Sequence, residues 1–188
     1  GRMTSWPVAG QFAAYTDAVT GATPLYYIKG MIQGYGVNMS DLPNLEDMLL
    51  GSMPGCIGEV SAVALISGLV ILLATRTITW HIPVSVIGTV AVISTVLNFV
   101  NPDLFIGPEY HLLCGGLLLG AIFMATDYTT SPMTHKGMVI YGIGIGGLTM
   151  VIRLFGSYPE GMSFAILIMN AFVPLIDKGV HSKRFSKI

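Results

Sequence analysis

Charged residues are scarce in this sequence. Asp, Glu, Lys and Arg make up 10% of its 188 residues, hydrophobic residues make up 53%, and the mean hydropathy is +0.71. Soluble domains carry about 25% charged residues, so these charges are too few to cover a water-soluble protein of this length. The net charge of -1 also excludes a basic surface for nucleic acid, and we expect no such partner. The composition is typical of an integral membrane protein that contacts lipid.

Cysteine is rarer still, and histidine is dispersed. Cys56 and Cys114 lie far apart and form no Cys-x-x-Cys pair, so a disulfide framework or an iron–sulfur cluster held by this chain alone has no support. Buried, unreactive thiols are expected. The histidines at the ends of apolar runs are His81, His111, His135 and His181. None is spaced from another as metal ligands are, so we expect solvated loop histidines and no metal site.

Five apolar runs have about the length that a spanning helix needs. They cover residues 57–75, 82–100, 110–126, 137–155 and 162–176. Glycine is frequent in them, most densely at 142–147, as in helices that pack closely in lipid. The sequence therefore predicts an all-α membrane protein with about five transmembrane helices. Its expected parts are an extracytoplasmic segment (1–54), a five-helix domain (55–177) and a basic cytoplasmic tail (178–188).

The placement of Lys and Arg predicts the topology. Four basic residues follow the last apolar run and place the C-terminus in the cytoplasm: Lys178, Lys183, Arg184 and Lys187. Counting back across five spans puts the N-terminal segment on the outer side. That segment has no basic start followed by an apolar core, so its export requires something upstream. We therefore expect the natural protein to have more membrane helices before residue 1.

Residues 17–23, Asp-Ala-Val-Thr-Gly-Ala-Thr, are the most informative part of the N-terminal segment. Their small side chains let a bulky group approach the backbone closely. Pro24 favours an extended conformation at Thr23, because a residue before proline is pushed out of the helical region. This presents the Thr23 hydroxyl near the carboxylate of Asp17. By composition alone, an ordinary turn is the favoured explanation of the same residues.

The same stretch resembles the flavinylation signal Asp-x-x-Ser/Thr-Gly-Ala-Thr/Ser. In that signal a flavin transferase joins FMN through its phosphate to the last hydroxyl residue. Every fixed position is met, by Asp17, Thr20, Gly21, Ala22 and Thr23. The resemblance implies FMN attached to Thr23 through a phosphoester. The other four residues would be the part that the transferase recognises.

Four further motifs lie at the edges of the apolar runs. They are Gly-Cys-Ile-Gly-Glu-Val-Ser-Ala at 55–62, Phe-Met-Ala-Thr-Asp-Tyr-Thr-Thr-Ser-Pro at 123–132, Tyr-Pro-Glu-Gly at 158–161, and Met-Asn at 169–170 with Pro-Leu-Ile-Asp at 174–177. With the flavinylation signal, they resemble RnfD, a membrane component of the Rnf electron-transport complex. They are also similar to its relative NqrB of the sodium-pumping NADH:quinone reductase, but the short tail and compact loops favour RnfD. The resemblance covers residues 16–177.

This resemblance implies a fold, a location and a function. The family has ten helices in two inverted halves, like urea transporters, and this chain matches the second half. It would lie in a bacterial or archaeal cytoplasmic membrane and carry FMN within a complex that couples redox flow to Na+ or H+ movement. Its FMN would relay electrons between partner subunits linked to ferredoxin and NAD. A second, non-covalent flavin stays open. The chain offers no catalytic acid, base or nucleophile, so catalysis would belong to the complex.

Two other classes of function remain. Gly-rich helices with a few intramembrane polar groups also suit half of a channel or secondary transporter with no redox role. The flavinylation signal distinguishes the two, because a solute channel has no need of it. A purely structural anchor is the third interpretation, and it predicts no effect of changing Thr23 or Asp127.

Polar residues near the apolar runs allow more than one role. Glu59, in the first turns of the first run, suits an ion path or a stabilising position at a helix N-terminus. Asp127, with Thr126 at the inner end of the third run, could bind a cation or terminate the helix. The resemblance favours a functional role there. Arg153 is expected to extend to the outer interface, a plainer role than pairing with a flavin phosphate.

Amides and tyrosines have similar alternatives. We expect Asn98 and Asn170, within helices, to form interhelical hydrogen bonds. The tyrosines of the N-terminal segment suit either a membrane interface or stacking on a flavin ring, and the sequence does not choose between these roles. They are Tyr26, Tyr27 and Tyr35.

Overall fold

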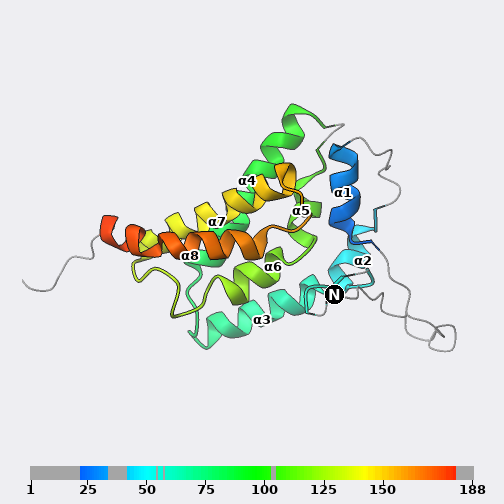
Figure 1. The fold of residues 1–188 in the computed structure, drawn as a ribbon. Helices are drawn as coiled ribbons and strands as arrows, with labels where there is room; N and C mark the ends of the chain where they lie inside the picture. Colours follow the sequence, from blue (N-terminus) through cyan, green and yellow to red (C-terminus); the bar gives the residue numbers. More distant parts are fainter. Residues whose placement is uncertain (1–21, 34–41, 54, 57, 103–104, 181–188) are drawn as a thin grey trace, which may run out of the picture.

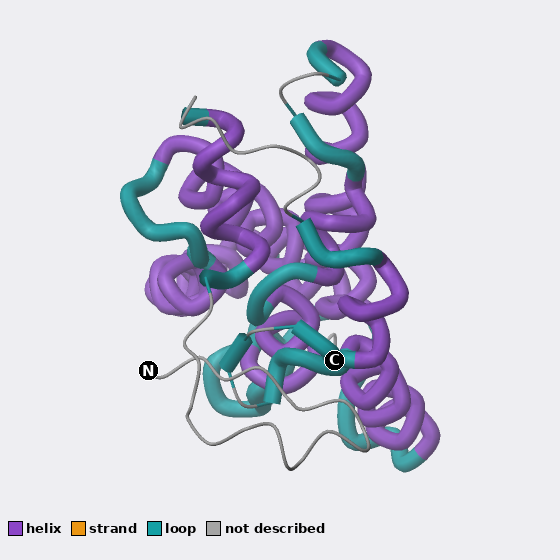
Figure 2. Tube along the Cα trace, turned by 90° about the vertical axis from the view of Figure 1, so that its right-hand side faces the viewer, coloured by secondary structure: helices purple, strands orange, loops and turns teal. Residues whose placement is uncertain are grey.

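The computed structural model describes residues 22–33, 42–53, 55–56, 58–102 and 105–180. Within these ranges every regular element is a helix and there is no strand, which confirms the all-α class (Figures 1 and 2). The helices are α1 (Pro24–Ile32), α2 (Leu45–Leu50), α3 (Ala62–Ala74), α4 (His81–Val100), α5 (Pro108–Leu113), α6 (Leu117–Leu119), the π-helical turn η3 (Gly120–Met124), α7 (His135–Phe155) and α8 (Met162–Gly179).

Among the described residues, three helices are long and apolar enough to cross a membrane. They are α4, α7 and α8, with 20, 21 and 18 residues. Each coincides with a predicted run, so three of the expected spans are confirmed as candidates. Helix α3 is also apolar but has only 13 residues. The count of five spans and the urea-transporter-like fold remain predictions.

The first apolar run becomes helical later than expected. We predicted a helix from residue 57, but α3 begins at Ala62. Gly58 has φ +95°, a left-handed conformation that interrupts any helix before it. The hydroxyl of Ser61 then accepts a hydrogen bond from the Ala64 amide (3.3 Å) and caps the new helix. Glu59 therefore lies in the turn before α3 rather than in its first turns.

The third apolar run is broken into α5, α6 and η3. The break falls at Gly115, which has φ +66°. A side chain at Gly115 would collide with Leu25 of α1 and with the carboxylate of Glu160. The run is thus one hydrophobic segment in the sequence. It folds as two short pieces, α5 and the continuous α6–η3, on either side of a left-handed glycine.

Helix α7 is the centre of the bundle, because it packs along both α4 and α8. Its glycines allow this contact. A Cβ at Gly146 would lie 2.8 Å from the Cβ of Thr89 on α4, and one at Gly142 would collide with Ser85. The Gly-rich stretch is therefore a helix-packing surface, as the sequence indicated. The buried core around it includes Val86, Val90, Leu117, Ala121, Tyr141, Ile145 and Met150.

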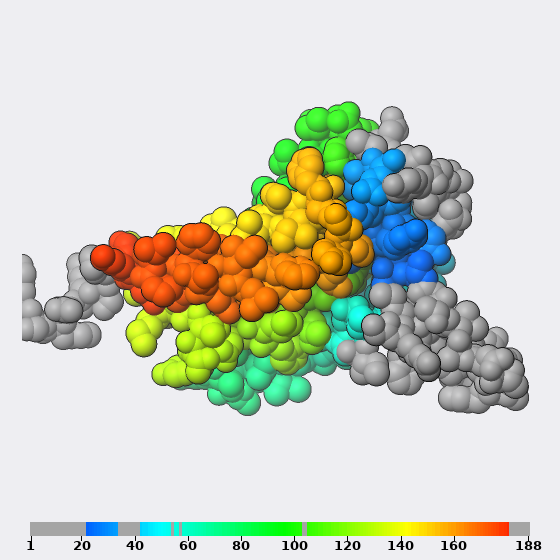
Figure 3. All heavy atoms as spheres, viewed as in Figure 1, coloured from blue at the N-terminus to red at the C-terminus, as the bar shows by residue number. Residues whose placement is uncertain are grey.

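Helices α1 and α2 cover one end of the bundle, which we call the capped end. Figure 3 shows α1, in blue, beside the turn that joins α7 to α8, in orange. A second apolar cluster joins these helices to α5 and the turn before α3. Its buried members include Leu25, Ile28, Met48, Met53, Val60, Ile106 and Cys114. The described part of the N-terminal segment therefore packs directly on the helices.

Candidate functional site

Thr23 is the residue immediately before α1 at the capped end. Its backbone is extended, with φ -69° and ψ 152°, and Pro24 takes the first helical position, as the sequence predicted. The Thr23 side chain makes no capping hydrogen bond to α1. Thr23 and Ala22 are both half-buried. The other three residues that match the flavinylation signal, Asp17, Thr20 and Gly21, lie outside the described residues.

Helix α1 is held on the bundle at two points. Leu25 and Ile28 are 3% and 2% exposed and pack into the second apolar cluster. Further along the helix, the Nζ of Lys29 donates a hydrogen bond to the carbonyl of Gly156, which caps the C-terminal end of α7. Burial lowers the pKa of Lys29. The apolar contact lies two residues from Thr23, so the position of Thr23 is tied to the bundle.

Beneath α1, Arg153 of α7 satisfies the broken end of α5. Its guanidinium donates to the carbonyls of His111 (2.6 Å) and Cys114 (3.1 Å). Carbonyls at a helix end lack partners in a following turn, and a cation is favourable there. Arg153 is only 3% exposed. The expectation that it extends to the membrane interface is therefore wrong, because the gap at Gly115 gives it internal acceptors.

Glu160 satisfies the other side of the same break. Its carboxylate accepts a hydrogen bond from the Gly116 amide, at the start of α6, and lies 3.9 Å from Arg153. Glu59 is 8% exposed and accepts a hydrogen bond from the Cys56 amide (3.1 Å). A Cβ at Gly116 would lie 3.1 Å from Glu59 and 3.3 Å from Glu160, so both carboxylates converge on that residue.

We call Arg153, Glu160 and Glu59 the helix-break cluster. Burial, followed by the nearby Glu59 carboxylate, raises the pKa of Glu160, while Arg153 opposes this rise. Among the described residues, the carboxylate that pairs with the Arg153 guanidinium is that of Glu160, 3.9 Å away, so the Glu59 charge has no direct ion pair with Arg153. Glu59 and Arg153 were expected separately from the sequence, no sequence pattern paired them, and Glu160 was not among the predicted site residues.

His111 differs from the expectation of solvated loop histidines, whereas His135 is exposed. His111 on α5 is 2% exposed, and its Nδ1 has no hydrogen-bond partner among the described residues. The rings of His81 and His135 stack with centroids 4.5 Å apart, and Trp80 stacks on His81 at 4.3 Å. His181 lies outside the described residues. The apolar neighbours of His111 were the available signal for its burial.

Asp127 lies near the start of the loop that connects η3 to α7. Its side chain accepts hydrogen bonds from the hydroxyls of Thr129 (2.5 Å) and Thr130 (3.1 Å), and these bonds lower its pKa. The Thr126 hydroxyl donates to the Ile122 carbonyl (2.6 Å). These interactions are local to the end of η3 and the loop that follows it. No group of three or more His, Cys, Asp or Glu side chains in the described ranges is placed to hold a metal ion.

The two intrahelical asparagines behave differently. The Tyr141 hydroxyl of α7 donates to Asn170 of α8, which confirms the interhelical bond expected there. The side chain of Asn98 instead donates to the carbonyl of Phe105 (2.6 Å), in the connection between α4 and α5. The prediction for Asn98 was wrong, because its side-chain amide is used by a loop carbonyl and not by another helix.

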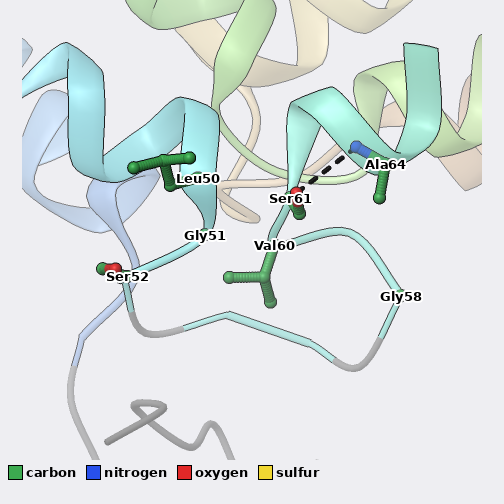
Figure 4. A pocket seen from close by; sticks show the side chains of 7 residues that line it. All are labelled: Leu50, Gly51, Ser52, Gly58, Val60, Ser61 and Ala64. Carbon is green, nitrogen blue, oxygen red and sulfur yellow. Dashed lines mark hydrogen bonds between the residues drawn. The ribbon is translucent and has the colours of Figure 1, made fainter. Parts of the chain in front are cut away.

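A pocket of about 360 Å3 lies where α2 meets α3 (Figure 4). It is lined by Leu50, Gly51, Ser52, Gly58, Val60, Ser61 and Ala64. The Ser61 hydroxyl is already used to cap α3, as the dashed line in Figure 4 shows. The lining carries no charged side chain, so it offers little to hold a phosphate.

Comparisons with known proteins give a consistent result. The model of the NQR2, RnfD, RnfE family matches residues 1–186. The D-type subunit of the proton-translocating ferredoxin:NAD(+) oxidoreductase complex of Clostridium ljungdahlii is 43% identical, over 97% of this chain and 57% of that protein. The D-type subunit of the Na(+)-translocating ferredoxin:NAD(+) oxidoreductase complex of Acetobacterium woodii is 43% identical, over 94% of this chain and 53% of that protein.

A third relative extends the range of sources. The D-type subunit of the ion-translocating oxidoreductase complex of Stutzerimonas stutzeri is 38% identical, over 93% of this chain and 50% of that protein. The chain therefore spans about half the length of the curated relatives it matches.

Proposed function

The chain belongs to the NQR2, RnfD, RnfE family, and we propose that it is an FMN-carrying, RnfD-like subunit of an ion-translocating oxidoreductase complex of the Rnf type. In this proposal it relays electrons between partner subunits linked to ferredoxin and NAD. The names of the relatives support the complex and its other subunits as partners. They include both a proton-translocating and a Na+-translocating complex, so they do not fix the ion.

The Thr23 hydroxyl is the observation that carries the FMN assignment. It ends a complete flavinylation signal, and it is not used to cap the helix that follows it. The first turn of α1 has no acidic side chain that would repel a phosphate. The positive end of a helix also favours a phosphate group. The residues around Thr23 therefore fit a phosphoester to its hydroxyl.

The chain itself would position the attached group. When bound, FMN supplies the ability to pass electrons singly or in pairs. Leu25 and Lys29 fix α1 to the bundle, so Thr23 has a defined place at the capped end. The buried charge of Arg153 lies beneath this helix, at the break between α5 and α6. Through α1 and its contacts, the bundle would hold a flavin at one fixed end.

We place the capped end on the outer side of the cytoplasmic membrane. The support is the basic C-terminal sequence, which begins with Lys178 near the end of α8. Helix α7 runs from the opposite end to the capped end, and α8 returns from it (Figure 1). A basic terminus in the cytoplasm then puts Thr23 outside, where an exported flavin transferase would reach it.

Covalent flavin is the direct test. The protein is co-expressed with an active flavin transferase, denatured, and examined by in-gel flavin fluorescence and intact mass. We expect a fluorescent band with one added FMN in the wild type and in Thr23→Ser, because the signal accepts either hydroxyl residue. Thr23→Ala should be dark. Covalent flavin on Thr23→Ala would overturn the attachment site. An unmodified wild type, with the transferase active on another target, would favour the transporter interpretation.

A further inference from the structure

Tyr26 is a large aromatic residue left exposed in the first turn of α1. Thr23 is the residue before α1 and Tyr26 is the third residue of that helix. Side chains at these two positions lie close enough to interact, as they do in a capping box. The Tyr26 amide donates to the Thr23 carbonyl (2.9 Å), which fixes the two backbones relative to each other. The Tyr26 side chain is 61% exposed. A group attached to the Thr23 hydroxyl would therefore have this ring within reach.

The other side chains of α1 are already committed to the bundle. Leu25 and Ile28 are buried, and Lys29 is bonded to the end of α7. Tyr27 is half-buried and packs on the second apolar cluster. Tyr26 meets Tyr27 edge-on, with ring centroids 6.3 Å apart and planes at 79°. An edge contact of this kind leaves room for a second ring on Tyr26.

We propose that Tyr26 is the stacking residue for the isoalloxazine ring of FMN carried by Thr23. This inference rests on the proposed function and adds a residue of this chain that would contact the flavin ring. The flexible ribityl chain of FMN separates phosphate from ring, so the ring can lie along the next turn of α1. Offset stacking of aromatic rings is favourable, and it would hold the ring in one orientation. The role of Tyr26 is to bind and orient.

A second exposed aromatic pair is the main structural competitor. Tyr158 and Phe164 have ring centroids 5.7 Å apart and are 64% and 46% exposed. They flank the turn that contains Glu160, so they are also near the capped end. Tyr26 is favoured because it is three residues from the attachment point, in the first turn of the helix that follows Thr23, whereas Tyr158 belongs to another segment. Interfacial anchoring in lipid is the remaining explanation for both exposed tyrosines.

Fluorescence per bound flavin tests the inference directly. A tyrosine or tryptophan ring stacked on flavin quenches its fluorescence, because the excited flavin takes an electron from the phenol or indole and returns it. The phenyl ring of phenylalanine is a poor electron donor, so it quenches little. The native protein carrying FMN on Thr23 should be strongly quenched. For the same amount of covalent flavin, Tyr26→Phe should have severalfold higher flavin fluorescence than the wild type. The fluorescence of Tyr26→Trp should again be strongly quenched.

A bright Tyr26→Phe between a quenched wild type and a quenched Tyr26→Trp distinguishes stacking from a structural role. If Tyr26 only supported the fold, Phe would resemble Tyr and the larger Trp would disturb the site. Tyr128→Phe is the matched control, because Tyr128 is 94% exposed and lies in the segment between η3 and α7, at the other end of the bundle (Figure 1). The flavin fluorescence of Tyr128→Phe should stay as strongly quenched as that of the wild type. The Thr23→Ala protein gives the background from any flavin not attached at Thr23.

The outcomes distinguish the two proposals. Absence of covalent flavin from the wild type would overturn the proposed function. Covalent flavin whose brightness is unchanged in Tyr26→Phe would overturn the stacking inference alone. So would brightening in Tyr158→Phe instead of Tyr26→Phe. If the Tyr26 variants are not flavinylated, the fluorescence lifetime of the flavin on the wild-type protein still tests stacking. A native lifetime as long as that of the denatured protein would overturn stacking.

Discussion

Arg153 and Glu160 lie 3.9 Å apart and satisfy opposite sides of one break in a helix. Arg153 donates to the carbonyls of His111 and Cys114, which end α5, while Glu160 accepts from the Gly116 amide, which begins α6. Each side chain thus supplies what one broken helix end lacks. Their mutual attraction keeps both in place, beneath the helix that begins after Thr23.

Removing the Arg153 charge should destabilise the protein strongly. Arg153→Met leaves two backbone carbonyls without donors and two nearby carboxylates without their cation. Breaking a fully buried pair costs about 3–5 kcal/mol, and we expect about 2–4 kcal/mol here, because Glu160 is 35% exposed. Thermal unfolding in detergent measures this. Lys136→Ala, at an exposed site, should change stability by less than about 0.5 kcal/mol. Equal effects of both variants would contradict the role of Arg153.

Arg153→Lys separates charge from geometry. A lysine keeps the positive charge but cannot donate to two carbonyls from a planar fork. We expect a stability between those of the wild type and Arg153→Met. A lysine variant as stable as the wild type would show that only the charge matters.

The Glu59 carboxylate should control how stability depends on pH. The pKa of Glu160 is raised above its usual 4.5, by burial first and by Glu59 second. Its contribution to stability is therefore present below that value and is lost as pH rises through the folded-state pKa. Glu59→Gln removes the like charge and keeps an acceptor for the Cys56 amide. The loss of stability from acidic to neutral pH should then become smaller than in the wild type.

The control for this comparison is an exposed carboxylate at the same end of the bundle. Glu109→Gln on α5 removes an equal charge from the surface, where solvent screens it. Its pH profile of unfolding should run parallel to the wild-type profile. If Glu59→Gln also ran parallel, the carboxylates of Glu59 and Glu160 would not be coupled.

Local features of the sequence predicted much of this structure. The long apolar runs form α4, α7 and α8. A helix of this length and composition can face lipid or other helices on every side, so its apolar sequence alone identifies it. Proline fixed the extended backbone at Thr23. The dense glycines of α7 proved to be its contact with α4. Each of these features depends on residues close together in the chain, so a single sequence contains the information.

The helix-break cluster depends on residues far apart in the chain. Arg153 is 39 and 42 residues from the carbonyls that it binds, and Glu160 is 44 residues from Gly116. No local pattern pairs them. The available signal was one Arg and two Glu at the edges of apolar runs, which lipid would force to find partners. The break itself was hidden because Gly115 and Gly116 are also common in continuous membrane helices.

A methyl group at Gly115 should disrupt the break. Gly115→Ala places an L residue at φ +66°, which costs about 1–2 kcal/mol, and its Cβ would collide with Leu25 and Glu160. Overpacking adds about 1–3 kcal/mol. Gly88→Ala on α4 is the matched control, because a Cβ there meets open space, and it should be neutral or slightly stabilising. A Gly115→Ala protein as stable as Gly88→Ala would contradict the left-handed turn.

Lys29 should hold the helix that follows Thr23 without holding the bundle. Lys29→Met keeps a long apolar stem but loses the donor to the Gly156 carbonyl at the end of α7. Hydrogen bonds to charged groups contribute about 1.5–3 kcal/mol, so α1 amides should exchange about 10–100-fold faster with solvent deuterium. Amides of α4 and α7 should be unaffected, because their core does not include α1. Lys178→Met, exposed on α8, should leave α1 protected. Equal exchange in α1 for both variants would mean that the apolar contacts of Leu25 and Ile28 alone fix this helix.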